Sequence, residues 1–289
     1  MTESPRLAFS TLAFPATSLA RAASLGRDYG YQGIELRLID GNLIDPSMPP
    51  TERATVKQTV AKAGLPIVAV DTSIRLTEDD PGPEISRFLE LASDWEAPAI
   101  RVFGGALSAH PETRAEQLKA AAQVLETAIP RAEQTGVAIG LETHDSFSAA
   151  AQVAELLAMV DSPMVGAVWD SHHPHRMGET PSEVYDHLAP RLLLAQVKDA
   201  RRAPADAEAP DDPDAWQLTL LGHGEVPVRQ MLHLLHAGGY QGWISVEWEK
   251  HWHPEIEDPE LALPQHYTLL TSWLAEEANA DQDGGDAAR

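Results

Sequence analysis

Four short segments of the chain end in a side chain that could bind a metal ion or move a proton. They span residues 138–142, 165–170, 192–198 and 243–247. Each has a residue pattern of period two, which is typical of a strand with two different faces. This period places Glu142, Asp170, Gln196 and Glu247 on a common side, at or near the carboxyl end of each strand.

Carboxylates gathered in a protein interior repel one another and lose their hydration, so they need a compensating positive charge. A single carboxylate at a strand end is more often a capping or salt-bridging group. Three on neighbouring strands, with an amide beside them, favour a divalent metal ion. The four donors include neither thiolate nor imidazole, so Mn²⁺ or Mg²⁺ is expected, with Co²⁺ as an alternative and Zn²⁺ less favoured.

Other polar residues could reach the same place. Arg101 has inward parity within residues 99–103, where it could bind a substrate hydroxyl or carboxylate, or neutralise Glu142. Glu35 and Lys198 share this parity and could simply pair with each other in the interior. The run 172–175 (HHPH) invites a second metal site, but consecutive positions rarely converge on one ion.

Strand-like and helix-like runs alternate along the chain. Strands are expected at residues 7–14, 33–37, 65–70, 99–103, 137–142, 165–170, 192–198 and 243–247. Helices are expected from near Ser18 to residues 26–30 and at 51–63, 83–95, 111–134, 148–160, 181–188, 226–237 and 259–276. This alternation implies parallel strands joined by right-handed crossovers.

Eight such units in about 275 residues predict an α/β fold, a closed (β/α)8 TIM barrel. An open doubly wound sheet is the alternative, but its GxGxxG fingerprint is missing after the first strand. We expect residues 1–277 to form one domain and the acidic tail 278–289 to be disordered. Residues 200–216 form a long acidic stretch rich in Pro and Ala, either a lid or functional loop over the strand ends or a solvated insertion.

Composition argues against several classes of partner. The 289 residues carry a formal net charge of −23, which would repel a phosphate backbone and predicts no nucleic-acid partner. The chain has no cysteine, no signal-like start and no run of apolar residues long enough to cross a bilayer. We therefore expect a cytoplasmic protein without a membrane partner.

Five motifs together resemble a known family. GLETH (140–144), WDSHHP (169–174), QVKD (196–199), LGHGEV (221–226) and SVEWE (245–249) are similar to the sugar phosphate isomerase/epimerase family of xylose isomerase-like TIM barrels. The resemblance implies that Glu142, Asp170, Gln196 and Glu247 bind one divalent metal ion, and that His173 contacts substrate oxygens beside it. The family usually has His where this chain has Gln196, so the identity of the metal transfers less firmly.

The chemistry expected of such a site begins with proton removal. A metal ion that binds a carbonyl and its neighbouring hydroxyl makes the adjacent C–H acidic, and Glu142 and Glu247 could then act as base and acid. Proton return gives epimerisation or isomerisation, whereas loss of a leaving group gives elimination. The expected substrate is a small keto-sugar or polyol ketone, contacted by His173 and by the candidates Arg101, His144, Lys198 and His223.

Several functional hypotheses follow from these residues. A sugar isomerase or epimerase is the leading one, and the resemblance also implies a homo-oligomer, because dimers and tetramers are common in the family. A lyase of the same family, acting as an inosose-type dehydratase or by elimination from a 3-keto-glycoside, shares every site residue. A DNA-repair nuclease needs extra histidines at strand ends that read DTS (71–73) and FGG (103–105) here, and a non-catalytic sugar-binding barrel would bind ligand without turnover.

Overall fold

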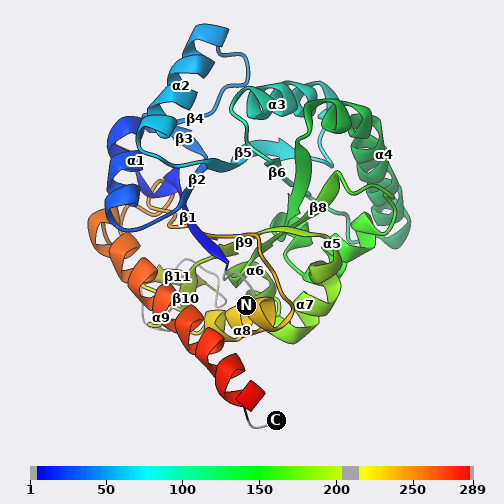
Figure 1. Ribbon diagram of the computed structural model, residues 1–289. Coiled ribbons are helices and arrows are strands. Elements are labelled where there is room, and N and C mark those ends of the chain that lie inside the picture. Colours follow the sequence, from blue (N-terminus) through cyan, green and yellow to red (C-terminus); the bar gives the residue numbers. More distant parts are fainter. Residues whose placement is uncertain (1–4, 204–214, 287–289) are drawn as a thin grey trace.

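A closed barrel of parallel strands forms the centre of the molecule. The computed structural model describes residues 5–203 and 215–286, and in this part eight strands close in the order β1-β12-β9-β8-β7-β6-β5-β2 (Figure 1). The strands are β1 (Arg6–Ser10), β2 (Gly33–Leu36), β5 (Ile67–Arg75), β6 (Ala99–Phe103), β7 (Ala138–Glu142), β8 (Val165–Asp170), β9 (Leu192–Val197) and β12 (Trp243–Val246). Pairing of β1 with both β2 and β12 closes the ring, which confirms the TIM barrel and excludes the open sheet.

Helices surround this barrel on its outside (Figure 1). They are α1 (Leu19–Asp28), α2 (Pro50–Lys62), α3 (Gly82–Asp94), α4 (Pro111–Thr135), α5 (Ala150–Leu157), α7 (Pro181–Leu188), α8 (Val228–Ala237) and α9 (Pro259–Asp286). Local sequence fixes several of their ends. Helix α4 begins with Pro111 and ends at Gly136, whose φ of 70° suits a residue without a side chain, and Thr180 with Glu183 forms a capping box before α7.

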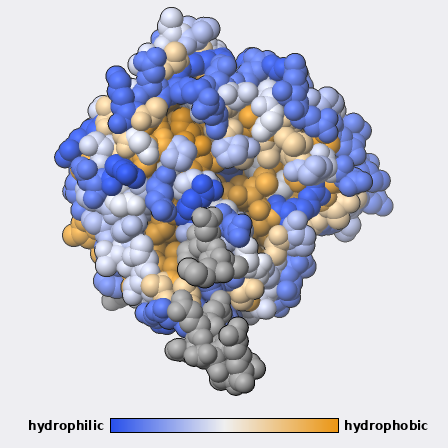
Figure 2. Space-filling view, viewed as in Figure 1, coloured by the Kyte–Doolittle hydropathy of each residue, from blue (hydrophilic) through white to orange (hydrophobic). Residues whose placement is uncertain are grey.

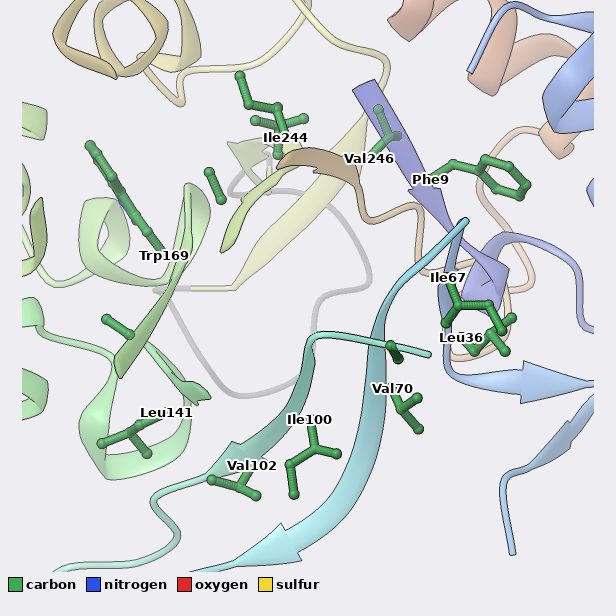
Figure 3. Close-up of a cluster of buried hydrophobic side chains, with 14 of the residues drawn as sticks. Phe9, Leu36, Ile67, Val70, Ile100, Val102, Leu141, Trp169, Ile244 and Val246 are labelled. Atoms are coloured by element: carbon green, nitrogen blue, oxygen red, sulfur yellow. The ribbon is translucent and has the colours of Figure 1, made fainter. Parts of the chain in front are cut away.

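Apolar and polar residues alternate along the strands, so the outer face of the barrel is hydrophobic and the carboxyl end of its inner face is polar. Leu141, Trp169 and Val246 point outward into the main hydrophobic core between strands and helices (Figure 3). Their chain neighbours therefore face the interior, where Ala69, Val168 and Leu194 form a small separate apolar cluster. On the face seen in Figure 2, polar residues dominate the rim and hydrophobic ones gather toward the middle. The polar residues at the carboxyl ends of the strands thus meet above an apolar floor.

The first strand is shorter than expected and the third is longer. Residues 11–13 form a 3-10 turn instead of continuing β1, because the Ser10 hydroxyl accepts a hydrogen bond from the Leu12 amide and caps the turn. Thr11 then accepts the backbone amides of Arg37 and Leu38, which ties the turn to the end of β2. Strand β5 continues to Arg75, past the predicted end at Val70, and so brings Asp71 into the barrel.

Three features were not predicted. Residues 172–176 form the short helix α6 (His172–Arg176), and β3 (Leu38–Ile39) pairs with β4 (Asn42–Leu43) in a small hairpin. The long stretch 200–216 begins and ends in a second hairpin, β10 (Asp199–Arg202) with β11 (Trp216–Thr219), and its residues 204–214 lie outside the described residues.

Helix α9 extends into the segment 278–289, for which disorder was predicted. It runs to Asp286, past the expected end at Glu276, and the last three residues lie outside the described part. No helix was predicted there because residues 278–286 lack apolar periodicity. Among the described residues, no helix combines the length and apolar character that crossing a membrane requires.

Candidate active site

The four predicted oxygen donors meet at the carboxyl ends of adjacent strands. Glu142, Asp170, Gln196 and Glu247 are each at most 4% exposed. Carboxylate oxygens of Glu142, Asp170 and Glu247 all lie within 4.8 Å of one another, close enough to share one metal ion. Strand register explains the convergence, because Asp170 and Ser245 both pair with Gln196 across the sheet.

Gln196 is oriented by the carboxylates around it. Its side-chain Nε2 donates to Glu35 Oε1 at 2.8 Å and, more weakly, to Glu247 Oε1 at 3.4 Å. Its Oε1 is buried and has no hydrogen-bond partner among the described residues. A buried oxygen left in this way normally has a partner, so the amide oxygen fits a cation bound beside the three carboxylates.

Lys198 already supplies one positive charge to this cluster. Its Nζ lies 3.0 Å from Asp170 Oδ2 and 2.5 Å from Glu247 Oε2, and it also contacts Glu249. Burial disfavours its charge, but these carboxylates outweigh burial and raise the pKa of Lys198 well above its ordinary value. The pairing of Lys198 with Glu35 that the sequence left open is not formed among the described residues, since Glu35 instead accepts from Gln196 and from Ser245 Oγ at 2.5 Å.

Arg101 neutralises carboxylates, one of the two roles considered for it. Its Nε lies 2.8 Å from Glu142 Oε2, and its guanidinium lies 3.6 Å from Asp71 Oδ2. It also donates to the Thr72 carbonyl at 2.8 Å, and its side chain is 2% exposed. These contacts fix the guanidinium beside Glu142, where it still lines the cavity above the cluster.

Negative charge remains in excess after these pairings. At the mouth of the barrel, the described residues include five buried carboxyl groups (Glu35, Asp71, Glu142, Asp170, Glu247) and three buried cations (Arg37, Arg101, Lys198). Burial and neighbouring carboxylates raise the pKa of Glu35 and Glu142 well above the usual range, and burial raises that of Asp71. With all groups ionised, negative charge would exceed positive charge by at least two, so the cluster needs protons or a bound cation to balance it.

Asp170 also positions the histidines of α6. Its Oδ1 accepts the backbone amides of His172 and His173 at 2.8 and 3.0 Å, so this helix begins at the carboxylate cluster. The His173 ring packs edge-on against His144 with a centroid distance of 4.6 Å, and neither His173 nitrogen has a hydrogen-bond partner in the part of the chain that the structure describes. Glu142, His144 and His173 form a second group that could hold a metal ion.

His223 does not join the other predicted substrate contacts. It is exposed and lies outside the residues that line the cavities over the cluster. Its loop is held by Asp199, which accepts the backbone amides of Gly222, Gly224 and Val226. The LGHGEV motif (221–226) therefore forms a loop that is bound to Asp199.

Two buried residues of the site were not singled out from the sequence. Asp71 lies beside Glu35 and Arg101, and its signal was the same period-two parity, hidden because the strand was expected to end at Val70. Arg37 donates to the Asp71 carbonyl and to Ser73 Oγ, and it lines the cavity. Nothing in the sequence distinguished Arg37 from the other charged residues at strand ends.

A cavity of about 240 Å³ opens directly above the carboxylates. Its wall contains Glu142, Glu247, Lys198 and Arg101 on the barrel side, with Phe103 and Trp252 among the other residues. The site thus offers a small polar chamber in which several groups able to carry a proton face one bound molecule.

Comparison with known proteins assigns the family. A family model described as a xylose isomerase-like TIM barrel matches residues 23–272. The chain belongs to this family. That assignment agrees with the predicted resemblance, and the closed barrel is the family's fold.

The similar proteins of known activity in this family are enzymes. Inosose dehydratase from Lacticaseibacillus casei is 27% identical over 147 residues, which are 48% of this chain and 47% of that enzyme. The inosose dehydratase of Bacillus thuringiensis (strain Al Hakam) is also 27% identical, over 146 residues. The chain thus matches about half the length of these curated relatives.

Solved structures share the fold over nearly the whole barrel. L-ribulose 3-epimerase superposes with a TM-score of 0.77 at 18% identity, covering 96% of this chain and 97% of that chain. The IOLI protein with a bound zinc atom gives a TM-score of 0.74 at 19% identity, covering 94% and 99%. Similarity at this level of identity shows a common architecture, so the reaction has to be argued from the site itself.

Replacing Arg101 should test how far its positive charge stabilises the buried carboxylates of Glu142 and Asp71. We expect Arg101→Met to lower the free energy of unfolding by about 3–5 kcal/mol, because it removes the guanidinium that lies beside the buried carboxylates of Glu142 and Asp71. Arg114→Met, which breaks the half-exposed ion pair with Glu155, should cost about 0–1 kcal/mol. Urea unfolding at neutral pH measures both, and equal losses would contradict the assignment of Arg101.

Proposed function

We propose that this chain is a divalent-metal-dependent isomerase or epimerase that removes a proton beside the carbonyl of a keto-sugar or polyol ketone. The observation that carries the proposal is the convergence of Glu142, Asp170 and Glu247 within 4.8 Å, next to the unpartnered Oε1 of Gln196. Membership of a family that contains sugar-converting enzymes supports the same reading.

Glu142, Asp170, Gln196 and Glu247 would hold the metal ion. When bound, the ion would stabilise negative charge on the substrate oxygen next to the acidic C–H. The all-oxygen donor set favours Mn²⁺ or Mg²⁺ over Zn²⁺, with Co²⁺ between them. Zinc in the similar IOLI structure is the reason to include Zn²⁺ in any reconstitution.

Glu142 and Glu247 are the proposed acid and base. Burial raises the pKa of Glu142 well above its usual range, although Arg101 opposes this, and a raised pKa suits a carboxyl group that exchanges a proton near neutral pH. Lys198, 2.5 Å from Glu247 Oε2, would stabilise that side chain when it is ionised. The two glutamates line the same cavity, so both can reach one bound ring.

Substrate oxygens would be held by groups at the edge of this cavity. His173 has two unpartnered ring nitrogens, and burial lowers the pKa of its imidazole well below the ordinary value, so it is a neutral donor and acceptor. His144, Arg101 and Lys198 line the cavity above the carboxylates and are the further proposed contacts, whereas His173 lines the neighbouring cavity and packs against His144. We assign no substrate contact to His223.

A lyase remains the second candidate for a specific reason. The curated relatives that match about half of the chain are inosose dehydratases. Dehydration shares the first step, removal of a proton beside a ketone, and differs only in the departure of a β-hydroxyl. The same residues serve both reactions, so the products distinguish them.

Proton exchange in D₂O tests the shared step. Protein loaded with Mn²⁺ should incorporate deuterium next to the carbonyl of at least one member of a panel of ketoses, inososes and 3-keto-glycosides, as followed by NMR. Glu142→Gln and Glu247→Gln should each lower the exchange rate by about 10²–10⁴-fold, because each removes a proton carrier. A new sugar isomer indicates epimerisation or isomerisation, and an unsaturated product indicates the lyase.

Glu225→Gln is the matched control for these variants, since Glu225 is exposed and lies outside the cavity above the carboxylates. It should retain the exchange rate of the parent. Absence of exchange with every member of the panel, or full exchange in the Glu142→Gln variant, would reject the proposal.

Orientation of Gln196 gives a second test that does not depend on turnover. Glu35→Gln should weaken Mn²⁺ binding by about 10–100-fold in calorimetry, because a glutamine can donate to Gln196 and turn its amide nitrogen toward the metal. Ser245→Ala is the control, since Ser245 contacts the other oxygen of Glu35. Unchanged affinity in Glu35→Gln would exclude Gln196 as an oriented ligand.

A further inference from the structure

A second and larger cavity lies beside the first. Its volume is about 620 Å³, and Glu249 lines both cavities. The two also meet at the contact between His144, in the first, and His173, in the second. A molecule bound at the carboxylates could therefore extend into the second cavity.

The second cavity has walls from four separate parts of the chain. Helix α6 supplies His172, His173 and Arg176, and the hairpin of β10 and β11 supplies Arg202, Trp216 and Leu218. Figure 1 shows α6 and this hairpin on the same side of the barrel, and the rings of His172 and Trp216 are 5.2 Å apart. The loop after β7 and the segment after β12 complete the wall with Asp145, Ser148 and His253.

Buried and unpartnered polar atoms line this cavity. His172 is 5% exposed and His173 is 7% exposed. Within residues 5–203 and 215–286, His172 Nε2 and both ring nitrogens of His173 have no hydrogen-bond partner. Buried polar atoms in native proteins are normally satisfied by protein, water or ligand. An imidazole ring can offer a hydroxyl group a donor or an acceptor, so these unpartnered nitrogens could bind hydroxyl groups of a ligand.

Trp216 adds a flat apolar surface to these polar groups. It is half-buried, with its ring against His172 and His175 and the guanidinium of Arg202 over it at 5.3 Å. Met177 and Leu218 extend the apolar part of the lining, and Arg176 and Ser148 the polar part. An aromatic surface surrounded by hydrogen-bonding groups suits a flat ring that carries hydroxyl groups.

We propose that the second cavity binds a second, hydroxyl-bearing ring of the substrate, so that the preferred substrates are two-ring keto-glycosides. The inference rests on the proposed function, which places the reacting ring at Glu142 and Glu247. A single ring would occupy the cavity of about 240 Å³ and leave the larger one to water. The second ring is either another sugar or a hydroxylated aromatic group, and its hydroxyls pair with the histidines of α6.

Binding of unreactive glycosides tests this inference independently of turnover. Calorimetry on the full chain loaded with Mn²⁺ compares methyl β-D-glucopyranoside, which has one ring, with cellobiose and 4-hydroxyphenyl β-D-glucopyranoside. At least one two-ring probe should bind about tenfold more tightly than the one-ring probe. Cellobiose as the tighter probe identifies a sugar in the second cavity, and the aryl glucoside identifies an aromatic group.

Trp216→Ala should remove this preference and leave the affinity for the one-ring probe unchanged. Trp252→Ala is the matched control, because Trp252 lines only the first cavity and is 48% exposed, so this variant should keep the ratio of affinities. Trp216→Gln, with circular dichroism on every variant, guards against an effect of misfolding. Equal affinities for all probes, no binding of any probe, or the same loss of preference in both tryptophan variants would overturn the inference.

Failure of this inference and failure of the proposed function are distinguishable. Deuterium exchange on a one-ring keto-sugar without a preference for two rings would reject the second cavity as a subsite and leave the reaction intact. A preference for two rings that Trp216→Ala removes, in a protein that exchanges no proton, would keep the subsite and reject the reaction.

Discussion

The main physical constraint on the interior of this barrel is that several carboxyl groups are buried with too few positive charges beside them. Arg101 and Lys198 each bridge two or more carboxylates, yet the cluster still carries more acid than base. Charges buried in this way are stable only when a proton or a cation balances them. The raised pKa of Glu142 means that a proton can balance its charge. A bound divalent ion would balance the same charge and keep Glu142 ionised, so that it could act as a base.

The scaffold is arranged so that this balance is local and rigid. Successive residues of a strand point to opposite faces, so a donor faces the interior when its neighbour packs in the hydrophobic core. Trp169 packs in this core, and the next residue, Asp170, therefore faces the interior. Asp170 in turn caps the start of α6 through two backbone amides, which places His173 over the cluster. Asp170 thus links the carboxylate cluster to the wall between the two cavities. A substitution at the cluster should therefore shift His173, and a substitution in α6 should shift Asp170.

The alternation of eight strands and helices was enough to predict the barrel, and period-two parity was enough to predict the inward direction of the four oxygen donors, because parity follows from which residues must be buried. It could not place Lys198 among these carboxylates, since the partner of a long flexible side chain depends on tertiary distances. Asp71 was missed when β5 was ended too early, and His223 was grouped with the site although its loop is bound to Asp199. The wall formed by Trp216 had no sequence signal, because a hairpin within an acidic stretch has no distinctive periodicity.

The most direct test of the central claim is the position of a bound metal ion. In a crystal soaked with Mn²⁺, the anomalous difference map should show one peak within bonding distance of Glu142, Asp170 and Glu247, with Gln196 Oε1 beside it. A peak among Glu142, His144 and His173 instead, or no peak at the carboxylates, would contradict the account.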